Sequence, residues 1–241
     1  MAVTRTVAPR RRGIWGTRRA KALVRGAATA ASATVLALAA TACSSGDSGT
    51  QVEGLCGPSA DSSAGTSLRQ VLRTDDFTAQ VLRSDDNFVR EFKKDLREWP
   101  GGENSTSPSF VCKYVPEDGK GHVLLDFAWS PANQPGKQRA RESGPFYDLN
   151  GATGEVGDQS SGLYVSCALG GELSARSRKA VLRADLSLTV NRGETVDKAR
   201  EAEQLSFLYY MTRAATEVLG CENKPLTKEP VVKPLTESST S

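Results

Sequence analysis

The segment Leu182-Arg183-Ala184-Asp185-Leu186-Ser187-Leu188-Thr189-Val190 carries the cleanest pattern in the chain. Apolar side chains occupy every second position, and polar or charged side chains stand between them. Successive side chains of a β-strand point to opposite faces, so this alternation predicts a strand with one apolar and one polar face. A strand of this kind is typical of an antiparallel sheet with one buried face.

Three further segments extend this sheet. Residues 110–115 and 123–129 alternate in the same way and are joined by a turn at 116–121, which predicts a hairpin. A third strand is expected at about 162–168. The intervening residues 131–161 are polar, contain Pro and Gly, and are interpreted as a long loop. The sequence therefore predicts an antiparallel sheet of about four strands.

Helical patterns flank the strands on both sides. Residues 67–73 predict a short turn or helix. A longer helix follows Ser84 and ends at a Pro-Gly-Gly sequence. Thr74 and Ser84 both precede paired acids, which suits the N-cap of a helix. The last helix is expected at 195–219, followed by a capping Gly220. The fold class is therefore α+β, with N-terminal and C-terminal helices packed on the sheet.

The N-terminal 42 residues resemble an export signal. Residues 1–26 are basic, and residues 27–42 are uncharged and rich in Ala. Sixteen weakly apolar residues are too few for a membrane span, which needs about 20, so residues 1–42 are interpreted as a signal peptide. The Arg18-Arg19 pair loosely matches a twin-arginine signal, and the choice between the two export routes stays open.

Small residues lead up to Cys43, in the order Leu38-Ala39-Ala40-Thr41-Ala42, and a Ser-rich segment follows it. This arrangement resembles the lipobox of bacterial lipoproteins. The resemblance implies that the Cys43 thiol receives a diacylglycerol and becomes the new N-terminus, with the membrane as its partner. Ala40-Thr41-Ala42 also fits an ordinary signal peptidase site, which would release a free secreted protein.

The other four cysteines are Cys56, Cys112, Cys167 and Cys221. An even set in an exported chain predicts two disulfides, which leaves Cys43 unpaired unless it is lipidated. Among the three connectivities, we favour Cys56–Cys112 and Cys167–Cys221, because each would join a helical segment to a strand.

The order of these motifs resembles small secreted lipoproteins of unknown function from actinobacteria. The shared features are an Ala-rich signal with a Cys, and then Cys56-Gly57, Cys112, Val165-Ser166-Cys167 and Leu219-Gly220-Cys221. The resemblance implies a location, the extracytoplasmic face of the cell membrane, and a fold class. It implies no activity.

Composition divides the chain into four parts: the signal peptide, a flexible tether at 43–55, a single α+β domain at 56–222 and a disordered tail at 223–241.

The whole chain has a net charge of +3, but residues 1–42 hold eight basic and no acidic side chains. The remaining 199 residues hold 23 basic and 28 acidic side chains and are acidic. A nucleic-acid partner is therefore not expected.

The domain offers few groups for catalysis. It has a single histidine, His122, at the turn into a strand, so a catalytic triad is not expected. The cysteines lack the C-x-x-C spacing of zinc sites. We therefore expect no metal site and no cofactor. The acids Asp75, Asp76, Asp85 and Asp86 could bind calcium, although helix capping explains them. Two hypotheses follow: a non-catalytic module that binds an envelope protein or small ligand, or an envelope hydrolase that uses carboxylates alone.

Overall fold

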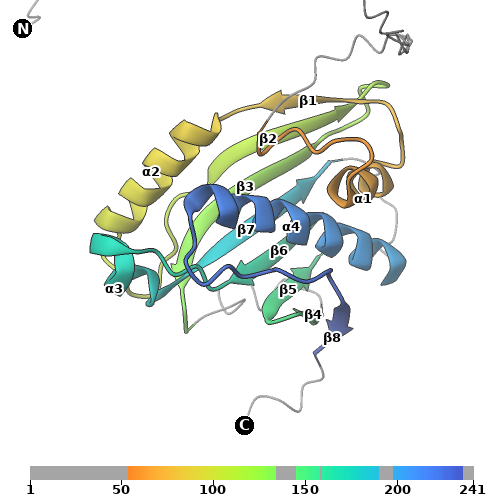
Figure 1. Ribbon diagram of the computed structural model, residues 1–241. Coiled ribbons are helices and arrows are strands. Elements are labelled where there is room, and N and C mark those ends of the chain that lie inside the picture. Colours follow the sequence, from red (N-terminus) through yellow and green to blue (C-terminus); the bar gives the residue numbers. More distant parts are fainter. Residues whose placement is uncertain (1–53, 134–144, 158, 190–197, 236–241) are drawn as a thin grey trace, which may run out of the picture. The chain divides into compact units, whose positions relative to one another are not determined.

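The computed structural model describes residues 54–133, 145–157, 159–189 and 198–235, all within the unit 47–241 (Figure 1). The signal peptide, Cys43 and the tether up to residue 53 lie outside the described residues. The elements in chain order are α1 (Ser63–Leu72), β1 (Phe77–Val81), α2 (Asp85–Glu98), β2 (Ser109–Pro116), β3 (Val123–Pro131), β4 (Phe146–Leu149), β5 (Ala152–Val156), β6 (Ser160–Val165), a 3-10 turn (Gly171–Leu173), α3 (Ser174–Ser177), β7 (Ala180–Leu188), α4 (Lys198–Leu219) and β8 (Val232–Pro234).

The strands form one antiparallel sheet in the order β1-β2-β3-β7-β6-β5-β4-β8. The α+β class and the antiparallel sheet are confirmed, but among the described residues the sheet has eight strands rather than about four. Helices α1, α2 and α4 lie on one face of the sheet, and α4 packs against β5, β6 and β7 (Figure 1). We call this the first face and the opposite one the second face.

The strands predicted from the clearest alternating patterns are confirmed. The hairpin corresponds to β2 and β3, the third strand to β6, and the segment at 182–190 to β7. The helix expected at 195–219 is α4. Gly220 ends it with a φ of 77°, and the backbone N–H of Cys221 reaches back to the carbonyl of Thr216. Only glycine adopts that φ without strain, which explains why the helix stops there.

The N-cap predicted at Thr74 is wrong, because a strand follows it. β1 occupies Phe77–Val81, and the Thr74 hydroxyl accepts a hydrogen bond from the backbone N–H of Asp76 at 3.1 Å. The hydroxyl therefore closes a local turn into the strand. Ser84 does precede a helix, α2, although its side chain makes no capping hydrogen bond.

The polar stretch at 131–161 is not one long loop. It contains β4 and β5, a hairpin whose connection is Asn150-Gly151. Both residues have positive φ, 55° and 93°, which a two-residue type I′ turn requires and which Asn and Gly tolerate best. The Asn-Gly pair was the sequence signal for these strands.

The disorder expected at 223–241 does not hold for residues 223–235. β8 pairs with β4, and Leu226 is 6% exposed. The Tyr209 hydroxyl donates to the carbonyl of Lys228 at 2.8 Å, which attaches the segment to α4. One buried leucine and a strand partner about 85 residues away in the sequence are enough to order a segment of low apolar content.

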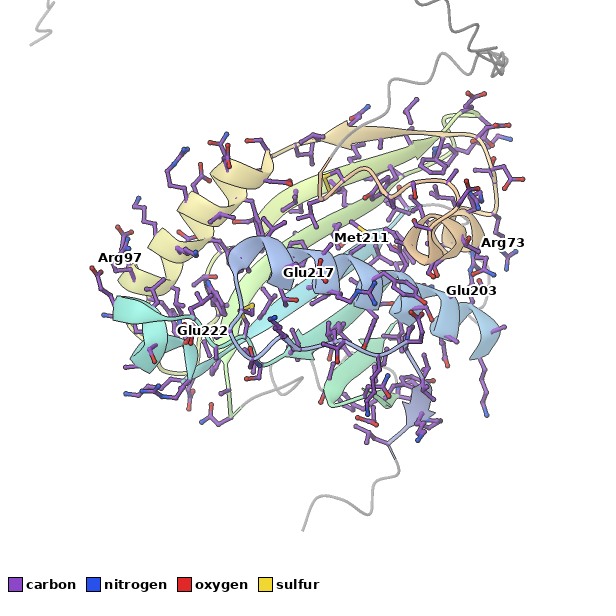
Figure 2. The ribbon with its side chains drawn as sticks, viewed as in Figure 1. Arg73, Arg97, Glu203, Met211, Glu217 and Glu222 are labelled. Atoms are coloured by element: carbon purple, nitrogen blue, oxygen red, sulfur yellow. A yellow bond between two sulfur atoms is a disulfide. The ribbon has the colours of Figure 1, made fainter. Side chains whose placement is uncertain are left out.

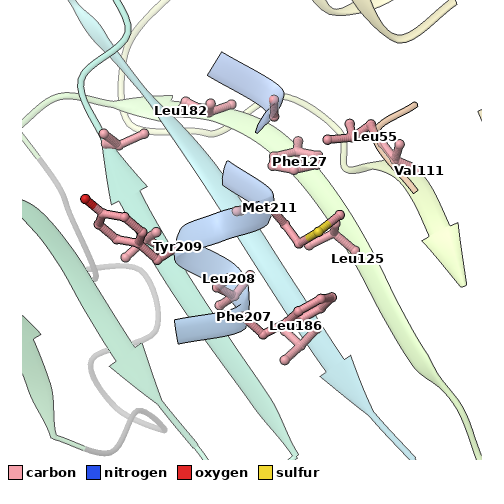
Figure 3. Close-up of a cluster of buried hydrophobic side chains, with 14 of the residues drawn as sticks. Leu55, Val111, Leu125, Phe127, Leu182, Leu186, Phe207, Leu208, Tyr209 and Met211 are labelled. Carbon is pink, nitrogen blue, oxygen red and sulfur yellow. The ribbon is translucent and has the colours of Figure 1, made fainter. Parts of the chain in front are cut away.

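The core lies between the first face and the helices. Alternate residues of β3, Leu125, Phe127 and Trp129, are fully buried there. Phe88 and Phe92 of α2 pack their rings on Phe127 and Trp129. Figure 3 shows Leu125, Phe127 and Leu186 of the sheet beside Phe207, Leu208 and Met211 of α4.

Two disulfides fix helical segments to this core, and the favoured connectivity is confirmed. Cys56, which precedes α1, is bonded to Cys112 on β2, with their Cα atoms 5.4 Å apart. Cys167, just after β6, is bonded to Cys221, just after α4, with a Cα separation of 5.1 Å. Each bond closes a long loop, which stabilises the fold by roughly 4 kcal/mol in the chain-entropy account.

Candidate functional site

Charged and polar residues of four adjacent strands meet on the second face. On β3 and β7, Asp126 lies directly opposite Asp185. On the other side of β7, Asp185 lies opposite Gly162 of β6. Gly162 in turn lies opposite Glu155 of β5. Directly opposed residues of an antiparallel pair share a face. This row faces away from the helices, because Phe127, the neighbour of Asp126 on β3, faces them. Asp126, Glu155, Tyr164, Arg183 and Asp185 are called the charged cluster below.

The cluster is held together by an ion pair and a hydrogen bond. Arg183 Nε lies 2.6 Å from Asp185 Oδ2, and the Tyr164 hydroxyl donates to Glu155 Oε1 at 2.8 Å. All four acidic and phenolic residues of the cluster are at most 6% exposed, and the Arg183 side chain is 12% exposed. Buried charges of this kind are tolerated because they are paired.

The electrostatic environment fixes the protonation states of two groups. Burial, followed by the negative charge of Glu155, raises the pKa of the Tyr164 phenol, so Tyr164 stays a hydrogen-bond donor. Burial by itself would lower the pKa of the Arg183 guanidinium, but the charge and hydrogen bond of Asp185, together with Tyr164 and Asp126, outweigh burial and the pKa is raised. Arg183 therefore stays charged.

Gly162 provides the space in which the Glu155 carboxylate lies. A Cβ atom at residue 162 would stand 2.9 Å from Glu155 Oε1, closer than van der Waals contact allows. Because residue 162 has no side chain, Glu155 lies over β6, where Tyr164 reaches it. A glycine inside a strand often marks such a close approach.

Most groups of the cluster are paired with one another rather than open to a substrate. It combines three carboxyl groups with one guanidinium, and Arg183 is paired with Asp185. Two of the carboxylates are already engaged, Asp185 by Arg183 and Glu155 by Tyr164. Within the described part of the chain, no group of three or more acids, histidines or cysteines is arranged to hold a metal ion.

A second feature is a hollow at the C-terminal end of α4. It has a volume of about 510 Å³ and is lined by Arg213, Thr216, Glu217, Gly220, Cys221, Glu222, Lys224, Pro225, Leu226 and Thr227. Figure 2 shows Glu217 near the end of α4 and Glu222 beyond it. Arg213 approaches Glu217 and Glu229, at 3.9 and 4.0 Å. Leu226, with a φ of 63°, turns the chain back under the helix end. Volumes of roughly 300–1,000 Å³ are typical of small-molecule sites.

The four acids proposed for calcium do not act as one site. Asp75 forms an ion pair with Arg69 at 3.3 Å, before β1. Asp85, at the start of α2, accepts the backbone N–H of Leu55 at 3.2 Å. These contacts attach the chain around α1 and Cys56 to the rest of the fold, which gives Asp75 and Asp85 a structural role.

The single histidine and two arginines near α3 also have hydrogen-bond partners. His122 precedes β3, and its Nδ1 lies 3.0 Å from the Thr189 hydroxyl. Arg176 donates to the carbonyl of Trp99 at 2.5 Å, and Arg178 donates to Ser174 at 2.7 Å. The basic residues at 137–141, like Cys43, fall outside the described residues.

Sequence reasoning missed both the charged cluster and the hollow. The signal for the cluster was present, because Asp126, Arg183 and Asp185 occupy the polar positions of two alternating strands. Their convergence depends on β3 lying beside β7, which the order of the strands in the sequence does not reveal. The hollow depends on the ordered segment after Cys221, where disorder was expected.

Comparison with known proteins gives no match to a family, to a curated protein or to a solved structure. Among the helices of the described residues, none has the length and apolar character that crossing a membrane requires.

Proposed function

We propose that this chain is a membrane-anchored extracytoplasmic lipoprotein whose disulfide-bonded domain is a non-catalytic binding or accessory module of the cell envelope. The pairing of the cysteines carries the proposal. Cys56 with Cys112 and Cys167 with Cys221 account for four of the five cysteines, so Cys43 is the one left for lipidation. Two stable disulfides also favour an oxidising, extracytoplasmic compartment. The resemblance to actinobacterial lipoproteins points the same way.

Metabolic labelling with a palmitate analogue tests the anchor. The full-length chain, expressed in a bacterium that processes lipoproteins, should be labelled and should sediment with membranes. Cys43→Ala should remove the label, whereas the matched variant Ser45→Ala should keep it. Label that survives Cys43→Ala would contradict the anchor. An unlabelled wild-type chain in the medium would instead support cleavage after Ala42.

Binding is supported by the chemistry of the hollow. Its wall combines the buried Leu226 with charged groups of both signs, Arg213 and Lys224 against Glu217 and Glu222. A small polar ligand, or a side chain of an envelope protein, would meet apolar contact and paired charge there. The charged cluster supports the non-catalytic part, because its ion pair and hydrogen bond engage two of its three carboxyl groups, which acid–base catalysis would need free.

Photocrosslinking in intact membranes tests this binding role. A benzoylphenylalanine at Thr227, an exposed residue of the hollow, should give a specific crosslinked product. The same probe at Lys120, exposed in the turn between β2 and β3, serves as the matched control and should give none. Glu217→Lys should weaken the product from Thr227. Equal products from both positions would contradict a binding site at the hollow.

The hydrolase alternative rests on one observation, the direct opposition of Asp126 and Asp185 on neighbouring strands. A glycoside hydrolase needs two such carboxyl groups at a cleft. The hollow contains neither of them. The alternative predicts that the wild-type chain releases reducing sugars from peptidoglycan and that Asp126→Asn abolishes the release. Our proposal predicts no release from either.

A further inference from the structure

Within the part of the chain that the structure describes, the sheet ends in two edge strands of different character, visible at opposite sides of the sheet in Figure 1. β8 is three residues long and contains Lys233 and Pro234. A charge and a proline on a short strand both hinder pairing with another chain. β1 is five residues long, Phe-Thr-Ala-Gln-Val, and contains neither. The β1 edge therefore lacks the protection that β8 has.

The register of β1 identifies the backbone groups that face outward. The carbonyl of Asp76 and the N–H of Leu82 both bond to residues flanking or within β2. In an antiparallel pair, alternate residues direct their N–H and C=O toward the partner and the others direct them away. Phe77, Ala79 and Val81 therefore present three outward N–H and C=O pairs, with Ala79 at the centre.

Apolar side chains gather at one end of this edge. Val81 and Leu82 are 46% and 48% exposed, and Phe110 of the neighbouring β2 is 46% exposed. The other exposed large apolar residues of the described chain, Val231 and Leu235, flank β8. The two edges thus both expose apolar groups, but only β1 combines them with an uncharged, proline-free strand.

We propose that β1 pairs antiparallel with β1 of a second copy of this chain and joins two sheets into a symmetric dimer. Pairing centred on Ala79 places Phe77 opposite Val81 of the second copy and uses all three outward residues of each strand. It also brings Asp75 opposite Arg83 of the second copy, twice by symmetry. A two-fold interface of this kind is self-complementary and closes after two copies.

Charge selects this register over its neighbours. Centring the pair on residue 78 would bring Arg83 opposite Arg73, and centring it on residue 80 would bring Asp75 opposite Asp85. Like charges directly opposite each other destabilise a pair of strands. Each copy already forms the ion pairs Arg69–Asp75 and Arg83–Glu91. In the register centred on Ala79, Asp75 of one copy lies opposite Arg83 of the other, so the ion pairs of the two copies form one row. The charges then alternate along the interface.

An exchange of charge between two copies tests the register. Differently tagged full-length chains are co-expressed, and co-purification is measured. Asp75→Lys should pair poorly with itself, and so should Arg83→Glu, each by roughly ten-fold or more. Asp75→Lys co-expressed with Arg83→Glu should pair as well as wild type, because both contacts then join opposite charges. A mixed pair no better than either variant alone would overturn the proposal.

A proline in the edge tests the backbone contacts. Ala79→Pro removes an outward N–H that makes no bond within the sheet, so the fold is retained while two hydrogen bonds of the dimer are lost. Ala79→Ser keeps the N–H and should behave as wild type. Monomeric wild-type chain in analytical ultracentrifugation, or equal association of the two variants, would overturn the proposal. An extended segment of another protein crosslinked along β1 would also overturn it.

Discussion

The two faces of the sheet are built from the same strands but are stabilised in different ways. On β3, Phe127 points to the first face and Asp126 to the second, and both are almost completely buried. On β7, Leu182 and Leu186 point to the first face, whereas Arg183 and Asp185 point to the second. The first face is stabilised by removing apolar surface from water, and the second by pairing charges that would otherwise be costly.

This contrast predicts different responses to substitution. An apolar core loses stability in proportion to the volume removed, and neighbouring groups are otherwise unaffected. A charged cluster responds according to which partner is left behind, so removing two groups can cost less than removing one. The following variants exploit that difference.

The largest effect is expected on the first face. Phe127→Ala removes a fully buried ring that contacts Phe88, and should lower the free energy of unfolding by about 3–5 kcal/mol. Leu124→Ala on the same strand, half-buried on the second face, should cost about 1 kcal/mol. Urea titrations should show the midpoint falling with an unchanged slope. Equal losses from the two variants would contradict the assignment of the faces.

The second face should respond to the removal of a single charge. Arg183→Met leaves Asp185 buried without its cation and should cost about 2–4 kcal/mol. Adding Asp185→Leu should restore part of this loss, with a coupling of about 1–3 kcal/mol in a double-mutant cycle. Strictly additive losses would mean that the ion pair contributes nothing to the fold.

Two glycines, one on each face, allow the cost of adding a methyl group to be compared between the faces. A Cβ at Gly154, on the first face, would meet the methyl ends of Leu149 and Leu205 at 2.8 Å, whereas one at Gly162 would meet the carboxylate of Glu155. Leucine ends can rotate away, but Tyr164 fixes the carboxylate. Gly162→Ala should therefore cost about 2 kcal/mol and Gly154→Ala about 1 kcal/mol. Glu155→Ala in the Gly162→Ala background should remove the clash, and a circular dichroism melt measures the recovery.

The sequence predicted those parts of the fold that depend on local periodicity. The alternation at 182–190, the 110–129 hairpin and the pattern of α4 each span enough residues to identify an element. The cysteine pairing followed from their positions, because Cys112 and Cys167 lie at strands and Cys56 and Cys221 beside helices. β4 escaped prediction because four residues carry little periodicity, and β8 because its stability comes from β4 and α4 rather than from its own composition.

The candidate sites depend on long-range arrangement, which is why they were missed. The polar positions of β7 predicted a polar face, but not that Asp126 and Glu155 would share it. That convergence requires β3 and β6 to flank β7, although β3 and β7 are about 50 residues apart in the chain. Local patterns do not encode such a neighbourhood, whereas the register of the sheet does.

Two buried tyrosines, one on each face, include the variant with the smallest expected effect, Tyr114→Phe. The Tyr114 hydroxyl on the first face has no hydrogen-bond partner in the described structure, whereas that of Tyr164 on the second face donates to Glu155. At pH 7, Tyr164→Phe should cost about 1.5 kcal/mol, whereas Tyr114→Phe should be neutral or slightly stabilising, because it removes a polar group that burial has deprived of water.

The same two tyrosines should make the free energy of unfolding fall as the pH rises above about 10. Burial raises the pKa of both phenols, so the folded state favours their neutral forms. This stabilisation is complete below the ordinary tyrosine pKa of about 10 and is lost as the pH rises above it. Each phenylalanine variant should therefore lose less stability than wild type between pH 9 and about pH 11, measured by urea unfolding. An unchanged alkaline loss in Tyr114→Phe would mean that its phenol reaches water, and the first face would then be less completely closed than its apolar neighbours indicate.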